Sequence, residues 1–152
     1  MEARVLGLLA DESAKTRMFS LKSLTILFTS HVAGLATEFL LKSGLEISDL
    51  LNDSDSANRE ESVRCLGAFL HYCADTRQEV TERLSKTVTT VMTNLTLHMD
   101  DDSEGLRDLI LGCLITLPVS LHPTLAGQVE KSLHSHRHTE HLNTLLNTLT
   151  KP

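Results

Sequence analysis

The residues best suited to chemistry are four histidines grouped near the C-terminus, in the segment HSHRHTEH from His134 to His141. On a helix, His134 and His138, or His138 and His141, would place two imidazoles on one face, as a zinc site requires. The segment nevertheless contains neither the HExxH nor the CxxC signature of zinc sites. We interpret it as a polar turn between two helices, and the alternatives are a small metal-binding protein or a pH-sensitive contact.

The remaining groups that could do chemistry are not arranged for it. Asp100, Asp101 and Asp102 are consecutive, without the spacing of a calcium loop, and are better suited to starting a helix. Cys73 lies two residues from His71, and side chains at this spacing do not face each other on a helix. The chain contains no GxSxG, P-loop or GxGxxG motif. We therefore expect no catalytic residue, no cofactor and no enzyme activity.

The cysteines indicate the compartment. Cys65, Cys73 and Cys113 are an odd number, and the first two are about 12 Å apart if they share a helix, which is too far for a disulfide. Free thiols in a reducing environment are the simplest interpretation. No apolar run approaches the roughly 18 residues of a membrane span, and the acidic N-terminal segment lacks the apolar part of a signal peptide. We expect a cytoplasmic protein.

Composition excludes several classes of partner. The 152 residues have the length of one domain, and 41% apolar with 22% charged residues is a globular composition. The net charge of −6 is wrong for binding nucleic acid or an anionic membrane, and aromatic residues at 3% offer little to stack on bases. Seven glycines and three prolines are too few for a turn-rich β-protein. Proteins remain as the expected partners.

Hydrophobic periodicity predicts an all-α fold. Apolar residues recur at helical spacing in six segments, and no segment alternates with a period of two. Asp11 is expected to be an N-cap, Thr76 and Glu79 to form a capping box, and Gly44 to divide 31–52 into two short helices. The six other expected helices cover 14–29, 57–74, 77–99, 104–117, 123–134 and 139–150.

An internal repeat organises these helices. Three segments share an apolar pair, an acidic turn and then an arginine in an amphipathic helix. They are LLAD (8–11) before Arg17, LLND (50–53) before Arg64 and LHMD (97–100) before Arg107. A period of about 40–47 residues with two helices per unit is typical of HEAT and armadillo repeats. The expected fold is a right-handed α-α superhelix of about 3.5–4 helix pairs, occupying 1–152 as one array.

The repeated charges are expected to be structural. An acid at the start of a helix is stabilised by the helix dipole, and an arginine can reach back to the turn or across to the neighbouring unit. The residues of this Asp–Arg series are Asp11, Arg17, Asp53, Arg64, Asp101 and Arg107. Each arginine is followed two positions later by a residue expected in the core, namely Phe19, Leu66 and Leu109. A ligand site is disfavoured because the pattern recurs.

The C-terminal part also resembles a known family. The segments LTLHMDD (95–101), RDLIL (107–111) and HSHR (134–137), followed by Leu142, Leu145 and Leu146, are similar to the C-terminal end of HEAT-repeat dynein axonemal assembly factors. The resemblance covers residues 92–150. It implies a role in the cytoplasmic preassembly of axonemal dynein arms, with dynein chains or chaperone and assembly factors as partners. It also implies that the chain is the C-terminal fragment of a longer array.

The leading functional hypothesis is therefore a non-catalytic scaffold that binds proteins. The alternative within the same class is a HEAT or armadillo adaptor in transport or trafficking. The second helix of each repeat is expected to line one surface, and its solvent-facing residues would select the partner. These second helices are 14–29, 57–74, 104–117 and 139–150.

Overall fold

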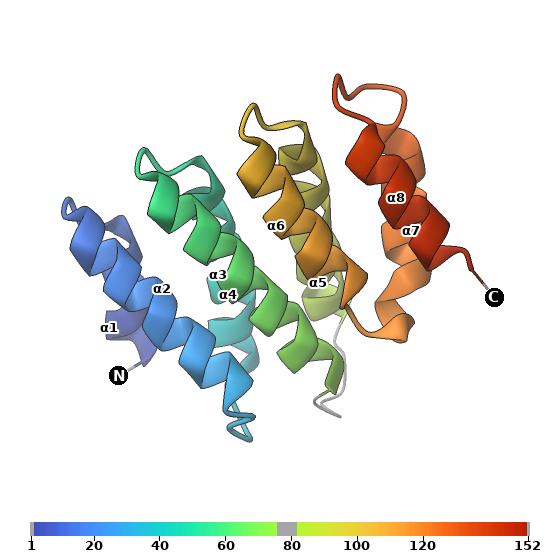
Figure 1. Cartoon of the computed structure of the whole chain (residues 1–152). Coiled ribbons are helices and arrows are strands. Elements are labelled where there is room, and N and C mark those ends of the chain that lie inside the picture. The colour runs from blue at the N-terminus through green and yellow to red at the C-terminus, as the bar shows by residue number, and fades with distance from the viewer. Residues whose placement is uncertain (1, 76–81, 152) are drawn as a thin grey trace.

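The computed structural model describes residues 2–75 and 82–151, and within these ranges the chain forms eight α-helices and no strand (Figure 1). The all-α prediction is confirmed. The helices are α1 Glu2–Gly7, α2 Ala14–Thr29, α3 Thr37–Asp49, α4 Ser56–Asp75, α5 Glu82–Leu97, α6 Glu104–Ile115, α7 His122–Ser132 and α8 Glu140–Leu149. Four short 3-10 helices connect them: η1 Leu8–Ala10, η2 Leu50–Asn52, η3 His98–Asp100 and η4 Val119–Leu121.

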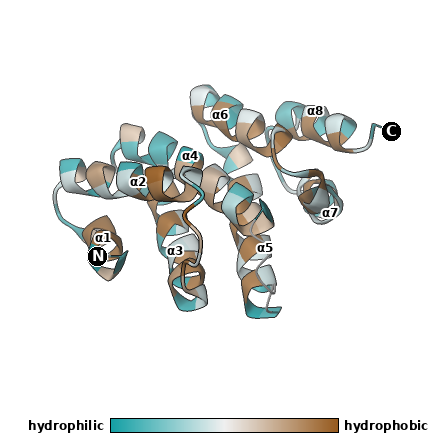
Figure 2. Cartoon of the chain, turned by 90° about the horizontal axis from the view of Figure 1, so that it is seen from below, coloured by the Kyte–Doolittle hydropathy of each residue, from teal (hydrophilic) through white to brown (hydrophobic). Residues whose placement is uncertain are grey.

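The helices alternate between two layers. α2, α4, α6 and α8 lie side by side and run in the same direction, and α1, α3, α5 and α7 lie behind them (Figures 1 and 2). Within each layer a helix packs on the helix two places further along the chain, as α2 does on α4 and α3 on α5. The layers are joined where consecutive helices meet, as at α3 with α4 and α7 with α8. Packing therefore follows the order of the chain from one end to the other.

A continuous apolar core joins the two layers. It is most aromatic where α2, α3 and α4 meet, with the Phe28 and Phe69 rings edge to face at 5.5 Å between centroids. Tyr72 is fully buried beside them, and its hydroxyl donates to the Val32 carbonyl at 2.7 Å. The apolar stripe expected on 57–74 is buried along its whole length, at Val63, Leu66, Phe69, Leu70 and Cys73. Burial of such surface is the main force that stabilises a fold of this kind.

The prediction that Gly44 ends a helix is wrong. Gly44 lies inside the continuous helix α3 and does not end it. A Cβ atom at Gly44 would lie 2.9 Å from both Phe69 Cζ and Thr87 Cγ2, so only glycine lets α3 approach α4 and α5 this closely. The need for close packing, and not for a chain break, explains the residue.

The N-terminal region also differs from expectation. Residues Glu2–Gly7 form α1, which the periodicity of so short a segment did not reveal. The N-cap of α2 is Ser13, and Asp11 lies two residues before it. The expected capping box of Thr76 and Glu79 lies outside the described residues.

Among the described helices, no single one is both long and apolar enough to cross a membrane. Glu104–Ile115 and Val119–Ser132 meet the requirement only as a pair, which is bent by 106°.

Candidate functional site

The turns that lead into α2, α4 and α6, which we call corners, share one backbone geometry. These helices and α8 form what we call the front layer. In each corner an aspartate accepts a hydrogen bond at 2.8 Å from the backbone N–H of the residue two places later, which caps the helix. The pairs are Asp11–Ser13, Asp53–Asp55 and Asp101–Ser103. The capping side chain then accepts from the backbone N–H three residues further on, as at Asp55 and Asn58. The aspartates thus shape the turns into α2, α4 and α6.

An arginine six residues after each aspartate closes the same corner. Its Nη1 donates to the carbonyl oxygen of that aspartate, at 2.8 Å for Arg17, 2.7 Å for Arg59 and 2.6 Å for Arg107. The predicted series named Arg64 where the structure has Arg59. Arg64 instead pairs with Glu61 of its own helix at 3.3 Å. The constant six-residue spacing from the turn aspartate was the signal that identifies Arg59.

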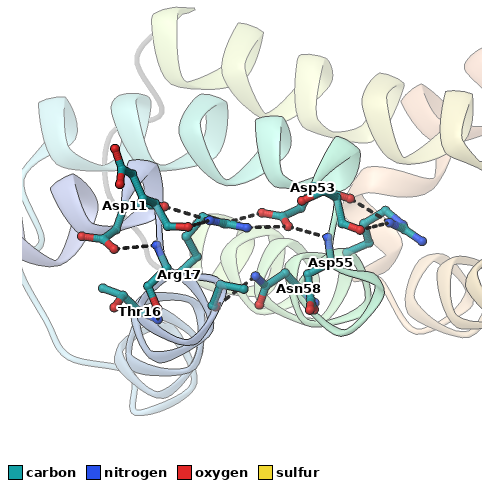
Figure 3. Close-up of polar contacts among 11 residues, drawn as sticks. Asp11, Thr16, Arg17, Asp53, Asp55 and Asn58 are labelled. Carbon is teal, nitrogen blue, oxygen red and sulfur yellow. Dashed lines mark hydrogen bonds and ion pairs between the residues drawn. The ribbon is translucent and has the colours of Figure 1, made fainter.

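Within residues 2–75 and 82–151, only the first arginine of this series also binds the corner before the next helix of its layer. Arg17 Nε donates to Asp53 Oδ2 at 2.7 Å and Arg17 Nη2 to Asp53 Oδ1 at 3.0 Å, from α2 to the corner before α4 (Figure 3). The Asp53 side chain is only 3% exposed. The hydrogen bond from Arg17, more than any other contact, lowers the pKa of Asp53 below its ordinary value. In contrast, Arg107 Nε is buried and makes no hydrogen bond within the described part of the chain.

The turn before α8 is a fourth corner, in which a basic residue takes the place of the aspartate. Arg137 lies two residues before Thr139, the N-cap of α8, and so takes the position of Asp11, Asp53 and Asp101. Its backbone N–H and that of His138 donate to Asp100 Oδ1 at 2.8 and 3.0 Å. These bonds, His138 first, lower the pKa of Asp100. The repeat pattern in the sequence aligned Asp100 with the turn aspartates. In the structure Asp100 instead binds the corner before α8, and Asp101 is the turn aspartate before α6.

The histidine cluster is spread over this corner and the start of α8. His141 Nε2 lies 2.5 Å from Asp108 Oδ1 of α6, and His138 contributes its backbone N–H to Asp100. His136 Nδ1 is buried without a hydrogen bond to any described residue. Across residues 2–75 and 82–151, no three His, Cys, Asp or Glu side chains are grouped so that they could hold a metal ion.

An open groove of about 440 Å³ crosses α2, α4 and α6 on the front layer. Its floor is formed by small residues, because Gly67 and Ala68 of α4 face Gly112 of α6. The helices meet closely here, since a Cβ at Gly67 would lie 2.7 Å from Cys113 Sγ. Arg64 and Asp108 add one charge of each sign to a lining that also contains three threonines and His71. We call this the front groove. Gly112 and Ala68, whose small size leaves it open, were not identified from the sequence.

The thiols next to the front groove are suited to packing and not to nucleophilic chemistry. Burial raises the pKa of Cys65 and of Cys113 to about 12, so both remain protonated at neutral pH.

Comparison with known proteins provides no family for this arrangement: no known protein family matches the sequence, and no curated protein is significantly similar to it.

Proposed function

We propose that the chain is a non-catalytic scaffold that binds proteins, built as an array of HEAT-like helix pairs in a right-handed superhelix. The observation that carries this proposal is the repeated corner, in which the same Asp–Arg geometry starts α2, α4 and α6. Arrays of such units provide surfaces that extend over several repeats and bind proteins through side chains from consecutive helices.

The front groove is the proposed binding surface. Its glycine floor lets a partner's backbone or small side chains approach α4 and α6 closely. Arg64 pairs with Glu61 and Asp108 with His141, but the two side chains are 49% and 63% exposed, so a partner's opposite charges can reach them on either side of an apolar anchor. A peptide segment with one apolar residue flanked by both charge signs fits this chemistry.

The proposed pathway is the cytoplasmic preassembly of axonemal dynein arms. Its support is the resemblance over residues 92–150, which includes Asp100, Asp101, Arg107 and Arg137. These four residues hold the corners before α6 and α8, so they serve the architecture and leave the groove residues to select the client.

A single substitution tests the groove without weakening the fold. No heavy atom lies within 4 Å of the position that a Cβ would take at Gly112, so Gly112→Gln would fill the groove and favour the helix by about 0.5–1 kcal/mol. Gly127 of α7 is equally open and lies outside the groove, so Gly127→Gln is the matched control. Each variant is expressed in cells that are building cilia, and axonemal dynein chains that co-purify with it are quantified.

We expect Gly112→Gln to reduce co-purification by about tenfold, while Gly127→Gln and the unchanged chain retain it equally. Equal retention by both variants would contradict the groove as the binding surface. Absence of dynein chains from every sample, including the unchanged chain, would contradict the assignment to dynein assembly.

A further inference from the structure

The outer face of α2 is unusually apolar for a surface. Phe19 is 62% exposed and Ile26 is 64% exposed. Beside them, a groove of about 600 Å³ runs between α1, α2 and the segment before α3, lined by Val5, Leu27 and Val32 among others. Exposed apolar side chains gathered over several turns of helix mark a binding surface more often than scattered single ones do.

The other helices of the front layer show what normally covers this face. Counted from the N-caps of their helices, the residues equivalent to Phe19 are Glu61 in α4, Leu109 in α6 and Leu145 in α8. Glu61 is only 9% exposed and Leu145 is fully buried. Thr25 of α2 donates to Glu61 at 3.4 Å, and α6 packs on α8, so the preceding helix of the layer covers each.

No described helix covers the equivalent face of α2, which lies at the end of the row (Figure 1). The sequence expectation that Phe19 belongs to the core is therefore wrong within this chain. Its register predicted a covered position. Of the three equivalent residues Glu61 and Leu145 are buried and Leu109 is partly buried, whereas no helix among the described residues covers Phe19.

The charges on this face identify the kind of partner. Lys15 lies one turn before Phe19, and Lys22 lies one turn after it; both are exposed. Among the described residues, no acid is within ion-pair distance of either lysine. In a chain whose net charge is −6, the outer face of α2 carries apolar and unpaired basic side chains, and Glu2 is the one charged residue among those that line the groove beside it. This face is complementary to a surface that carries apolar and acidic side chains.

We propose that the outer face of α2 binds an acidic amphipathic helix of a partner protein, which stacks on α2 as α2 stacks on α4. The inference rests on the proposed scaffold function and assigns it a second surface, away from the front groove. The partner's apolar stripe would cover Phe19 and Ile26, and its carboxylates would pair with Lys15 and Lys22. Recognition of an amphipathic helix by an apolar groove is a common mode of peptide binding.

A second copy of this chain is a poor occupant for the same face. Two α2 faces would present lysines to each other and leave both pairs without a carboxylate. The opposite end of the row does not fit either. Counted from the N-cap, α8 has Asn143 and Asn147 where α2 has Arg17, which binds Asp53, and the buried Leu21. Both asparagines are exposed. A head-to-tail contact would therefore bury amides against Phe19.

Two synthetic peptides test the proposal directly. Both are stapled helices of about 20 residues with the same leucine stripe; glutamates flank it in one and lysines in the other. Fluorescence anisotropy with the purified chain is expected to show binding of the acidic peptide at least about tenfold tighter than of the basic one. Phe19→Asp combined with Ile26→Asp should remove this binding. Lys15→Glu combined with Lys22→Glu should reverse the preference between the peptides.

Val119→Asp is the matched control, because Val119 is 77% exposed on η4, remote from α2 in sequence, and should leave binding unchanged. Equal binding of both peptides, no binding of either, or insensitivity to the Phe19 and Ile26 changes would overturn the proposal. So would sedimentation showing a dimer that Phe19→Asp abolishes, or binding to phosphatidylserine vesicles in place of the acidic peptide.

The same variants separate this proposal from the scaffold function. If the double aspartate variant loses the acidic peptide only, both proposals stand and concern different surfaces. If the peptides fail but Gly112→Gln still reduces co-purification of dynein chains, the α2 surface is wrong and the front groove stands. If the acidic peptide binds but no dynein chain co-purifies, the dynein assignment is wrong and the helix-binding face stands.

Discussion

The first and the last contact in the front layer are built from different chemistry on equivalent positions. Where α2 and α4 begin, the contact between them is polar: Arg17 binds Asp53 with two hydrogen bonds, and Asn58 Nδ2 donates to the Ala14 carbonyl at 3.1 Å. Between α6 and α8, the residues equivalent to Asn58 and Glu61 are Leu142 and Leu145, both fully buried. In both pairs the two helices nevertheless lie side by side in the same layer (Figure 1).

This difference separates two roles of the contacts between neighbouring helices, which are to specify the register and to contribute stability. Hydrogen bonds are directional, so the Arg17–Asp53 pair specifies which turn of α2 faces which corner of α4. Leucines fix the register less strictly but contribute free energy through the apolar area they bury. The fourth corner, where Arg137 replaces the turn aspartate, shows that the front layer does not need the Asp–Arg pair before every helix. We therefore expect the apolar contact to contribute more to stability and the polar one more to specificity.

The largest effect should come from the apolar contact. Leu145→Ala removes a fully buried side chain of α8, which packs on α6 and α7, and should lower the free energy of unfolding by about 2–5 kcal/mol. Asn147→Ala, two residues later and exposed, is the control and should change it little. Urea unfolding followed by circular dichroism measures both. A smaller loss for Leu145→Ala than for Asp53→Asn would show that we have ranked the two contacts in the wrong order.

The polar contact should cost less and should depend on pH. Asp53→Asn keeps the size of the side chain but removes the charge that Arg17 binds, at a cost of about 1–3 kcal/mol near neutral pH. The pKa of Asp53 is lower in the folded chain than its ordinary value of 3.8. Its contribution is therefore complete above that value and is lost as the pH falls through the folded pKa.

The difference between the unchanged chain and Asp53→Asn should accordingly be constant above about pH 5 and shrink below pH 4. Urea midpoints measured across this range test the sign. A difference that grows toward acid pH would mean that the folded carboxyl is protonated more easily than the unfolded one.

The sequence predicted the helices well but predicted the contacts between them less well. Periodicity located α2 at 14–29, as observed, because an amphipathic helix records its buried face in its own residues. It did not explain Gly44, since that glycine is set by Phe69 and Thr87 on two other helices. Nor did it identify the front groove, which exists only where α4 and α6 meet. The exposure of Phe19 likewise depends on what lies beside α2, and no pattern within the helix records this.

The arginines of the first and third corners should differ by a smaller amount. Arg17 donates to the carbonyls of Asp11 and Glu12 and to both carboxylate oxygens of Asp53. Arg107 donates to the Asp101 carbonyl, and its buried Nε has no hydrogen-bond partner among the described residues. Replacing Arg107 by methionine removes one hydrogen bond and also a buried group without a partner, and these effects oppose each other. Arg17→Met should therefore lower Tm by about 2–4 °C more than Arg107→Met. Thermal scans at neutral pH and the same protein concentration measure the difference. Equal values would mean that the bonds across to Asp53 add nothing beyond those that close the corner.

The smallest effect should appear in the chemistry of two equivalent cysteines. Cys65 lies between α2 and α4, where it contacts Thr25, and Cys113 lies between α4 and α6, with its Sγ 3.9 Å from the Val63 carbonyl. Burial raises the pKa of each to about 12, so a thiol reagent at pH 8 labels either one only when the local contact opens. Cys113 is partly exposed and Cys65 is fully buried, so Cys113 should be labelled first in the unchanged chain.

Asp53→Asn loosens only the α2–α4 contact and should speed labelling of Cys65 several-fold while leaving the rate at Cys113 nearly unchanged. Mass spectrometry of the labelled peptides resolves the two sites from Cys73. If both rates rise together, the layer opens as one cooperative unit, and the polar and apolar contacts cannot be assigned separate local stabilities.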